Sequence, residues 1–66
     1  MKSELEFFAF DVLGDFVDPK DISIDEKEKV VLVKRCPLDL VSTLTQEWER
    51  ETRCTEWFDV GLVFLP

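Results

Sequence analysis

The sequence predicts an α+β fold: a small single domain in which a sheet of about three strands carries one packed helix. Residues 37–53 place apolar side chains at steps of three and four, which is the spacing of one face of a helix. Residues 29–35 and 55–65 are rich in branched and aromatic residues, which is typical of strands. Because the chain has 66 residues, we expect one domain that covers residues 1–66.

Residues 3–13 fit either a second helix or an added strand. For a helix, Ser3 and Glu6 have the spacing of a capping box, and Gly14 stands where a helix would end. One face of that helix would carry the apolar side chains of Leu5, Phe8, Ala9, Val12 and Phe16. A strand also suits the phenylalanines, because aromatic residues are favoured in sheets. We favour the helix and keep the added strand as the alternative.

The middle of the chain predicts a hairpin. A turn at Asp18 and Pro19 precedes the alternating residues 22–24, which fit a short strand. Residues 25–28 are polar and fit a four-residue hairpin loop that leads into residues 29–35. Four consecutive branched residues in that segment, VVLV, are typical of a strand buried on both faces. We therefore place this strand at the centre of the sheet.

The helix of residues 37–53 is expected to begin directly after the central strand. Pro37 suits the first turn of a helix, where its missing N–H is not needed. Asp39 near the start and Arg50 near the end both complement the helix dipole. The expected buried stripe consists of Leu38, Val41, Leu44 and Trp48, with Leu40 beside them.

Residues 55–65 are expected to form the last strand. One face of this strand would carry Phe58, Val60, Leu62 and Phe64. Trp57 shares the other face with Asp59, so we expect it to be partly exposed. A strand, a helix and a strand in succession are typical of a parallel, right-handed crossover, so we expect residues 29–35 and 55–65 to be parallel neighbours.

The charge of the chain is −7, and most of it lies in the first part. Residues 1–28 contain nine acids and three lysines, whereas residues 29–66 contain six acids and five bases. Nucleic acids and anionic membranes both attract basic surfaces, so we expect no direct nucleic-acid partner and no membrane partner. No segment is apolar over the ~20 residues that a membrane span requires, and no signal-peptide pattern is present, so we expect a cytoplasmic protein.

No cofactor and no metal site are expected. The chain has no histidine and two cysteines, which are too few ligands for zinc. Asp15 and Glu26 have the spacing of the first and last ligands of an EF-hand loop. Val17 and Pro19 stand in place of oxygen ligands, however, and Lys20 replaces the required glycine, so calcium binding by that motif is not predicted.

The composition favours a non-enzymatic protein-binding module, a regulator or inhibitor that occupies a basic surface of a protein partner. The candidate partner-binding residues are Asp15, Asp18, Asp21, Asp25, Glu26 and Trp57. Carboxylates on one surface would accelerate encounter with a basic partner, and tryptophan is frequent at interface hot spots. Nucleic-acid mimicry is one form of this hypothesis, in which the carboxylates imitate phosphates.

Two other classes stand as alternatives. A chain this small buries little surface by itself, so it is alternatively a structural subunit of a homo-oligomer. The third class is a small enzyme that uses a carboxylate pair or Cys36. The Cys36 thiolate would be favoured by a helix N-terminus and by the neighbouring Lys34 and Arg35.

The sequence predicts no disulfide between Cys36 and Cys54. The intervening helix would separate them by about 27 Å, whereas a disulfide requires Cα atoms within about 7 Å. Alkylation under denaturing conditions, followed by mass measurement, should label both thiols. A protein that takes no label without prior reduction would contradict both this prediction and the helix.

Overall fold

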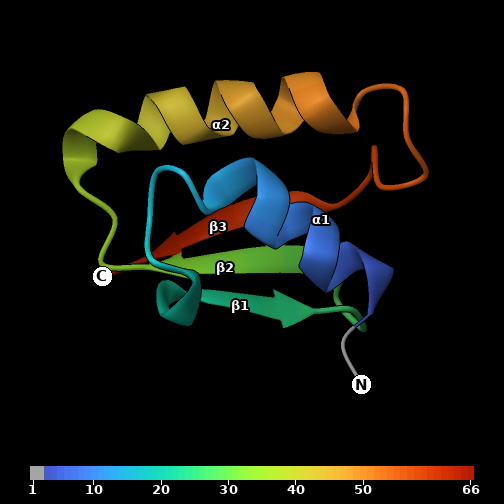
Figure 1. The fold of residues 1–66 in the computed structure, drawn as a ribbon, viewed down its shortest axis with the longest axis horizontal. Coiled ribbons are helices and arrows are strands. Elements are labelled where there is room, and N and C mark those ends of the chain that lie inside the picture. Colours follow the sequence, from blue (N-terminus) through green and yellow to red (C-terminus); the bar gives the residue numbers. More distant parts are fainter. Residues whose placement is uncertain (1–2) are drawn as a thin grey trace.

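In the computed structural model, which describes residues 3–66, two helices lie on one face of a three-stranded sheet (Figure 1). The helices are α1 (Glu4–Leu13) and α2 (Leu38–Thr52), and a short 3-10 helix, η1 (Pro19–Asp21), follows α1 in the chain. The strands are β1 (Ile22–Asp25), β2 (Val30–Lys34) and β3 (Gly61–Leu65). The predicted α+β fold is confirmed. No helix among these residues is long and apolar enough to cross a membrane.

The central position predicted for β2 is confirmed, because the strand order is β1-β2-β3. A hairpin joins β1 to β2, and these two strands are antiparallel. β3 runs parallel to β2, with Gly61 opposite Val30 and Leu65 opposite Lys34. The chain reaches β3 through α2, as the strand–helix–strand pattern predicts for parallel neighbours.

Residues 4–13 are helical, so the alternative of an added strand is wrong. The Glu6 backbone N–H donates to the Ser3 hydroxyl oxygen at 3.2 Å, which is half of the predicted capping box. Gly14 follows the helix, and its N–H donates to the Phe10 carbonyl oxygen at 2.8 Å. The backbone of Gly14 has a right-handed helical conformation (φ −64°), so the glycine is not required for a left-handed one. A Cβ at this position would collide with the Phe10 carbonyl oxygen, and this close approach requires glycine.

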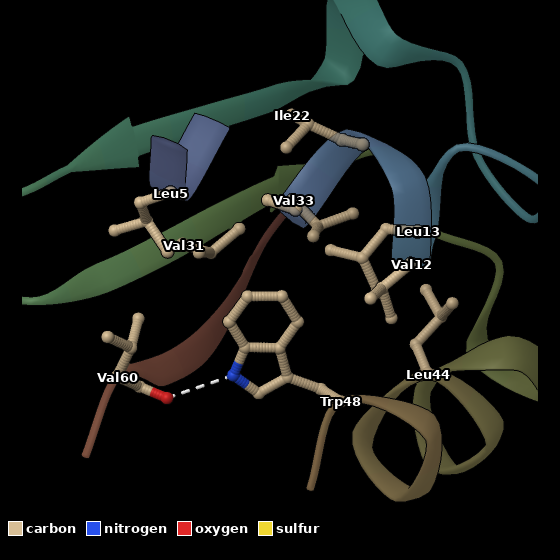
Figure 2. Close-up of a cluster of buried hydrophobic side chains, with 10 residues drawn as sticks. Leu5, Val12, Leu13, Ile22, Val31, Val33, Leu44, Trp48 and Val60 are labelled. Atoms are coloured by element: carbon tan, nitrogen blue, oxygen red, sulfur yellow. Dashed lines mark hydrogen bonds between the residues drawn. The ribbon is translucent and has the colours of Figure 1, made fainter. Parts of the chain in front are cut away.

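The buried face of α2 is shifted along the helix from the predicted stripe. Leu44 and Trp48 are buried as expected, but Leu38 is 90% exposed and its predicted place in the core is wrong. The stripe continues instead to Thr52, whose hydroxyl donates to the Trp48 carbonyl oxygen at 2.7 Å. A buried threonine is tolerated because this bond satisfies its hydroxyl. The Trp48 indole N–H donates to the Val60 carbonyl oxygen at 2.9 Å (Figure 2).

The core lies between the helices and one face of the sheet. Val31 and Val33 point from β2 into it and are fully buried (Figure 2). Leu32 lies between them in the strand, so it points to the opposite face, and it is partly exposed. The predicted burial of β2 on both faces is therefore wrong within this chain. Phe16, expected on the buried stripe of α1, is 36% exposed. The buried apolar residues are Leu5, Ala9, Val12, Leu13, Ile22, Val31, Val33, Leu44, Trp48 and Val60.

The last strand begins at Gly61, so its predicted start at residue 55 is wrong. Residues 53–59 form turns instead. The Thr55 hydroxyl oxygen accepts from the Trp57 backbone N–H at 3.1 Å, and the Val60 N–H donates to the Trp57 carbonyl oxygen at 2.9 Å. These local hydrogen bonds compete with the hydrogen bonds that an extended segment would make to a neighbouring strand. As a result Phe58 does not line the sheet and is 70% exposed.

Replacement of a buried residue of α2 should cost far more stability than replacement of an exposed residue of the same helix. Leu44 is fully buried, so Leu44→Ala should lower the free energy of unfolding by about 2–5 kcal/mol. Glu49 is exposed, and Glu49→Ala should change it by less than about 0.5 kcal/mol. Urea denaturation of both variants measures the difference. Equal losses would contradict the placement of the core.

Candidate functional site

The acids predicted to bind a partner lie on both sides of β1 in the chain. Asp15, Asp18 and Asp21 precede the strand, whereas Asp25 ends it and Glu26 follows. A strand of four residues separates the two groups by about 13 Å. The structure therefore does not bring these five acids together as one site.

Three of these carboxylates are engaged locally. Asp21 accepts from the Arg35 guanidinium at 2.6 Å. Asp18 accepts from the Lys20 backbone N–H at 3.0 Å, and Asp25 from the Glu28 backbone N–H at 3.1 Å. Asp18 stabilises a turn, Asp25 stabilises the hairpin, and Asp21 pairs with the residue that follows β2. Part of the acidity of this region therefore has a structural role.

Glu26 and Trp57 do lie together, in a groove that we call the Trp57 groove. It has a volume of about 370 Å³ and is formed by the start of α1, the β1–β2 hairpin and the turns before β3. It is lined by Glu4, Leu5, Glu26, Lys29, Glu56, Trp57, Asp59 and Val60. These residues come from three segments that are distant in the sequence.

Stacked aromatic rings fix the wall of the Trp57 groove. The Trp57 ring lies 4.7 Å from the ring of Phe8, measured between centroids, with an angle of 35° between the planes. Phe8 in turn makes an edge contact with the buried Trp48, at 5.5 Å and 68°. This chain of contacts connects Trp57 to the core and holds it half-buried.

One ion pair crosses the groove. Lys29 donates to the Asp59 carboxylate at 2.8 Å, and this hydrogen bond lowers the pKa of Asp59 and raises the pKa of Lys29. Glu4, Glu26 and Glu56 are exposed and make no ion pair with the residues that the structure describes. The groove is therefore negative overall, because Lys29 neutralises one of its four acids.

The groove suits an organic cation better than a metal ion. Within residues 3–66, no three carboxylate or cysteine side chains lie close enough to hold a metal together. The exposed glutamates instead surround an aromatic ring, and the face of tryptophan attracts ammonium and guanidinium groups. The arrangement can hold the end of a lysine or arginine side chain between its acids and Trp57.

The small-enzyme alternative with Cys36 depends on a thiolate, and the surroundings of Cys36 do not favour one. Burial raises the pKa of its thiol, and the nearby Asp39 raises it further. Arg35, which was expected to favour the thiolate, pairs with Asp21 instead. Cys36 and Cys54 are free thiols that lie just outside the two ends of α2.

A second groove lies between α2 and the segment that leads into β3. Its volume is about 570 Å³, and it shares Asp59 and Val60 with the Trp57 groove. The remaining lining residues are Thr45, Trp48, Glu49, Thr52, Arg53, Phe58, Gly61 and Leu62. The exposed Phe58 therefore stands beside one groove and Trp57 in the other.

Comparison of the chain with protein-family models, with curated proteins and with solved structures finds no match. The site is therefore interpreted from its own geometry. Of its residues, sequence reasoning identified Glu26 and Trp57 and missed Glu4, Lys29, Glu56 and Asp59. In the turn segment, EWFD, two acids flank two aromatic residues, and the strand predicted for residues 55–65 included this segment.

The Lys29–Asp59 pair should be visible in the titration of Asp59. Because the folded-state pKa of Asp59 lies below its ordinary value of 3.8, the pair stabilises the folded chain above that pH. This stabilisation is lost as the pH falls through the folded-state pKa. NMR titration of the Asp59 carboxyl carbon should show the lowered midpoint, and Lys29→Gln should return it toward 3.8. An unchanged midpoint in the variant would show that the ion pair does not form in solution.

Proposed function

We propose that this chain is a protein-binding module that occupies a basic surface of its partner, with the Trp57 groove receiving a lysine or arginine side chain. Occupation of a basic surface blocks it, so the module acts as a regulator or inhibitor. The observation that carries this proposal is that a half-buried tryptophan shares the groove with three glutamates that make no ion pair within residues 3–66. Cation–π attraction and carboxylate hydrogen bonds favour the same ligand, a guanidinium or an ammonium group.

The size of the groove supports a side chain as its ligand. At about 370 Å³ it is near the lower end of the range for small-molecule pockets, roughly 300–1,000 Å³. It is also open and lined by flexible glutamates rather than enclosed by apolar walls. A protein partner would place one basic side chain here and bury further surface around it.

The exposed Phe58 supplies an apolar contact next to the groove. It is 70% exposed and directly follows Trp57 in the chain. Protein interfaces commonly combine aromatic anchors with a charged rim. The segment of residues 55–59 would thus present an aromatic residue to each of the two grooves, with Glu56 and Asp59 as the charged rim.

Nucleic-acid mimicry is the less favoured form of this proposal. A mimic requires carboxylates that follow one another along a surface as phosphates do. Asp21 and Asp25 lie at opposite ends of β1 and each is engaged with a neighbouring group. A cytoplasmic location is part of the proposal, and the two free thiols, Cys36 and Cys54, support it.

Binding of an oligo-arginine peptide tests the groove directly. In ¹H–¹⁵N spectra at low ionic strength, the indole signal of Trp57 should shift on addition of the peptide, whereas the buried Trp48 provides an internal reference. An oligo-glutamate peptide should have no effect. The double variant Glu26→Gln, Glu56→Gln should weaken oligo-arginine binding roughly threefold to tenfold, because each exposed charge contributes up to about 1 kcal/mol.

A matched control separates the groove from the general acidity of the chain. Asp15→Asn with Asp18→Asn removes the same charge from positions that do not line the groove. When both double variants are compared at physiological salt, this one should change binding of oligo-arginine by less than about twofold, because exposed charges are then screened beyond about 8 Å. Equal weakening in the two double variants would contradict the proposed site and leave a diffuse electrostatic attraction.

A further inference from the structure

One face of the sheet is uncovered. Because Val31 and Val33 point into the core, the alternation of β2 sends Leu32 and its neighbours to the opposite face. The paired strands follow the same alternation. The residues of this open face are Ser23, Asp25, Val30, Leu32, Lys34, Gly61, Val63 and Leu65. No helix among residues 3–66 packs on it, since both helices contribute to the core on the other side.

The open face is apolar and neutral, in contrast to the rest of the chain. Four of its eight residues are branched aliphatics, and Val63 is 40% exposed. Asp25 and Lys34 are its charged residues and cancel each other, although the whole chain carries a charge of −7. The run of branched residues in β2 is typical of a strand covered on both faces.

We propose that the open face is the contact surface of a reversible symmetric dimer, in which two copies of this chain stack sheet against sheet. The two-fold axis lies between the sheets, at right angles to the strands, and passes over Leu32 and Val63. The two sheets then face each other with opposite strand directions, in the aligned packing typical of stacked sheets. A neutral face lets two acidic chains approach with the least repulsion.

The register of the sheet makes this face complementary to itself. Asp25 and Gly61 lie at one end of the face, and Lys34 and Leu65 at the other. The two-fold axis brings each end over the opposite end of the second copy. Leu65 then meets Gly61, where the missing side chain leaves a hollow, and Lys34 approaches Asp25. Both contacts occur twice.

The competing orientation is unfavourable. A two-fold axis parallel to the strands would keep each end over the same end and would place Lys34 over Lys34 of the second copy. Like charges that face each other across an interface cost several kcal/mol. Lys34 has no ion-pair partner within residues 3–66, so its charge is available for an interaction between copies.

The size of the face predicts a weak dimer. Three strands of up to five residues form a face of about 14 Å by 16 Å, so its flat area is roughly 230 Å² on each copy. Standard stable interfaces bury about 800 Å² on each partner. The association should therefore be reversible, with monomer at high dilution. The contact does not include Trp57, which packs against Phe8 on the helix side, so it is independent of the proposed function.

Sedimentation equilibrium over a wide concentration range tests the dimer, with Leu32 as the central position. Leu32→Lys and Leu32→Glu each place two like charges next to the axis and should raise the dimer dissociation constant more than about tenfold. An equimolar mixture of the two variants should dimerise at least as well as the parent chain. Leu38→Lys, at an exposed leucine outside the face, should leave the dissociation constant unchanged.

A second variant separates dimerisation from folding. A Cβ added at Gly61 would lie 3.7 Å from a side-chain carbon of Val30, which is an ordinary van der Waals contact. Gly61→Val should therefore preserve the fold of the monomer. Valine also favours strands. It fills the hollow for Leu65, and the dimer should weaken about fivefold or more. The proposal is overturned if the parent chain stays monomeric at millimolar concentration or if either Leu32 variant dimerises as the parent does. It is also overturned if the mixture of Leu32→Lys and Leu32→Glu does not dimerise, or if Gly61→Val dimerises as strongly as the parent.

Discussion

The hydrogen bond from the Trp48 indole N–H to the Val60 carbonyl oxygen connects the second half of the fold to the core. It joins α2 to the residue that immediately precedes β3, at 2.9 Å within a buried environment. A buried indole N–H without a partner would be costly, so this bond restricts how the chain can leave α2. The turns of residues 53–59 lead the chain from the end of α2 to this bond, and β3 begins at the next residue, Gly61.

The candidate site lies beside the same contact, because Val60 also lines the Trp57 groove. Phe8 packs between Trp48 and Trp57, so the ring that forms the groove wall is held against the residue that anchors α2. The groove takes its charge from other segments, because Glu4 begins α1 and Glu26 lies in the hairpin. A loss of core packing at Trp48 would therefore also disturb the binding surface, although Trp48 itself is 2% exposed.

The chain has two surfaces of different chemistry. The groove side carries exposed glutamates beside an aromatic ring, whereas the open face of the sheet is largely aliphatic and neutral. A domain of this size buries a limited fraction of its surface, and its core uses one face of the sheet. The acidic Trp57 groove is the surface proposed to bind a basic partner. The apolar open face of the sheet is the surface proposed to bind a second copy.

The sequence by itself determined the features that depend on neighbouring residues. The period of three and four at Leu44 and Trp48, the cap at Ser3 and the branched run of β2 each reflect a local preference, and the structure confirms them. The tertiary structure decided the rest. Leu38 lies outside the core because α2 packs through its later turns, and the Trp57 groove combines three distant segments whose meeting no local pattern encodes. The outer face of β2 has the apolar pattern of a covered strand, yet both helices of residues 3–66 pack on the other face, because the packing of α1 and α2 is decided by the whole core and not by one strand.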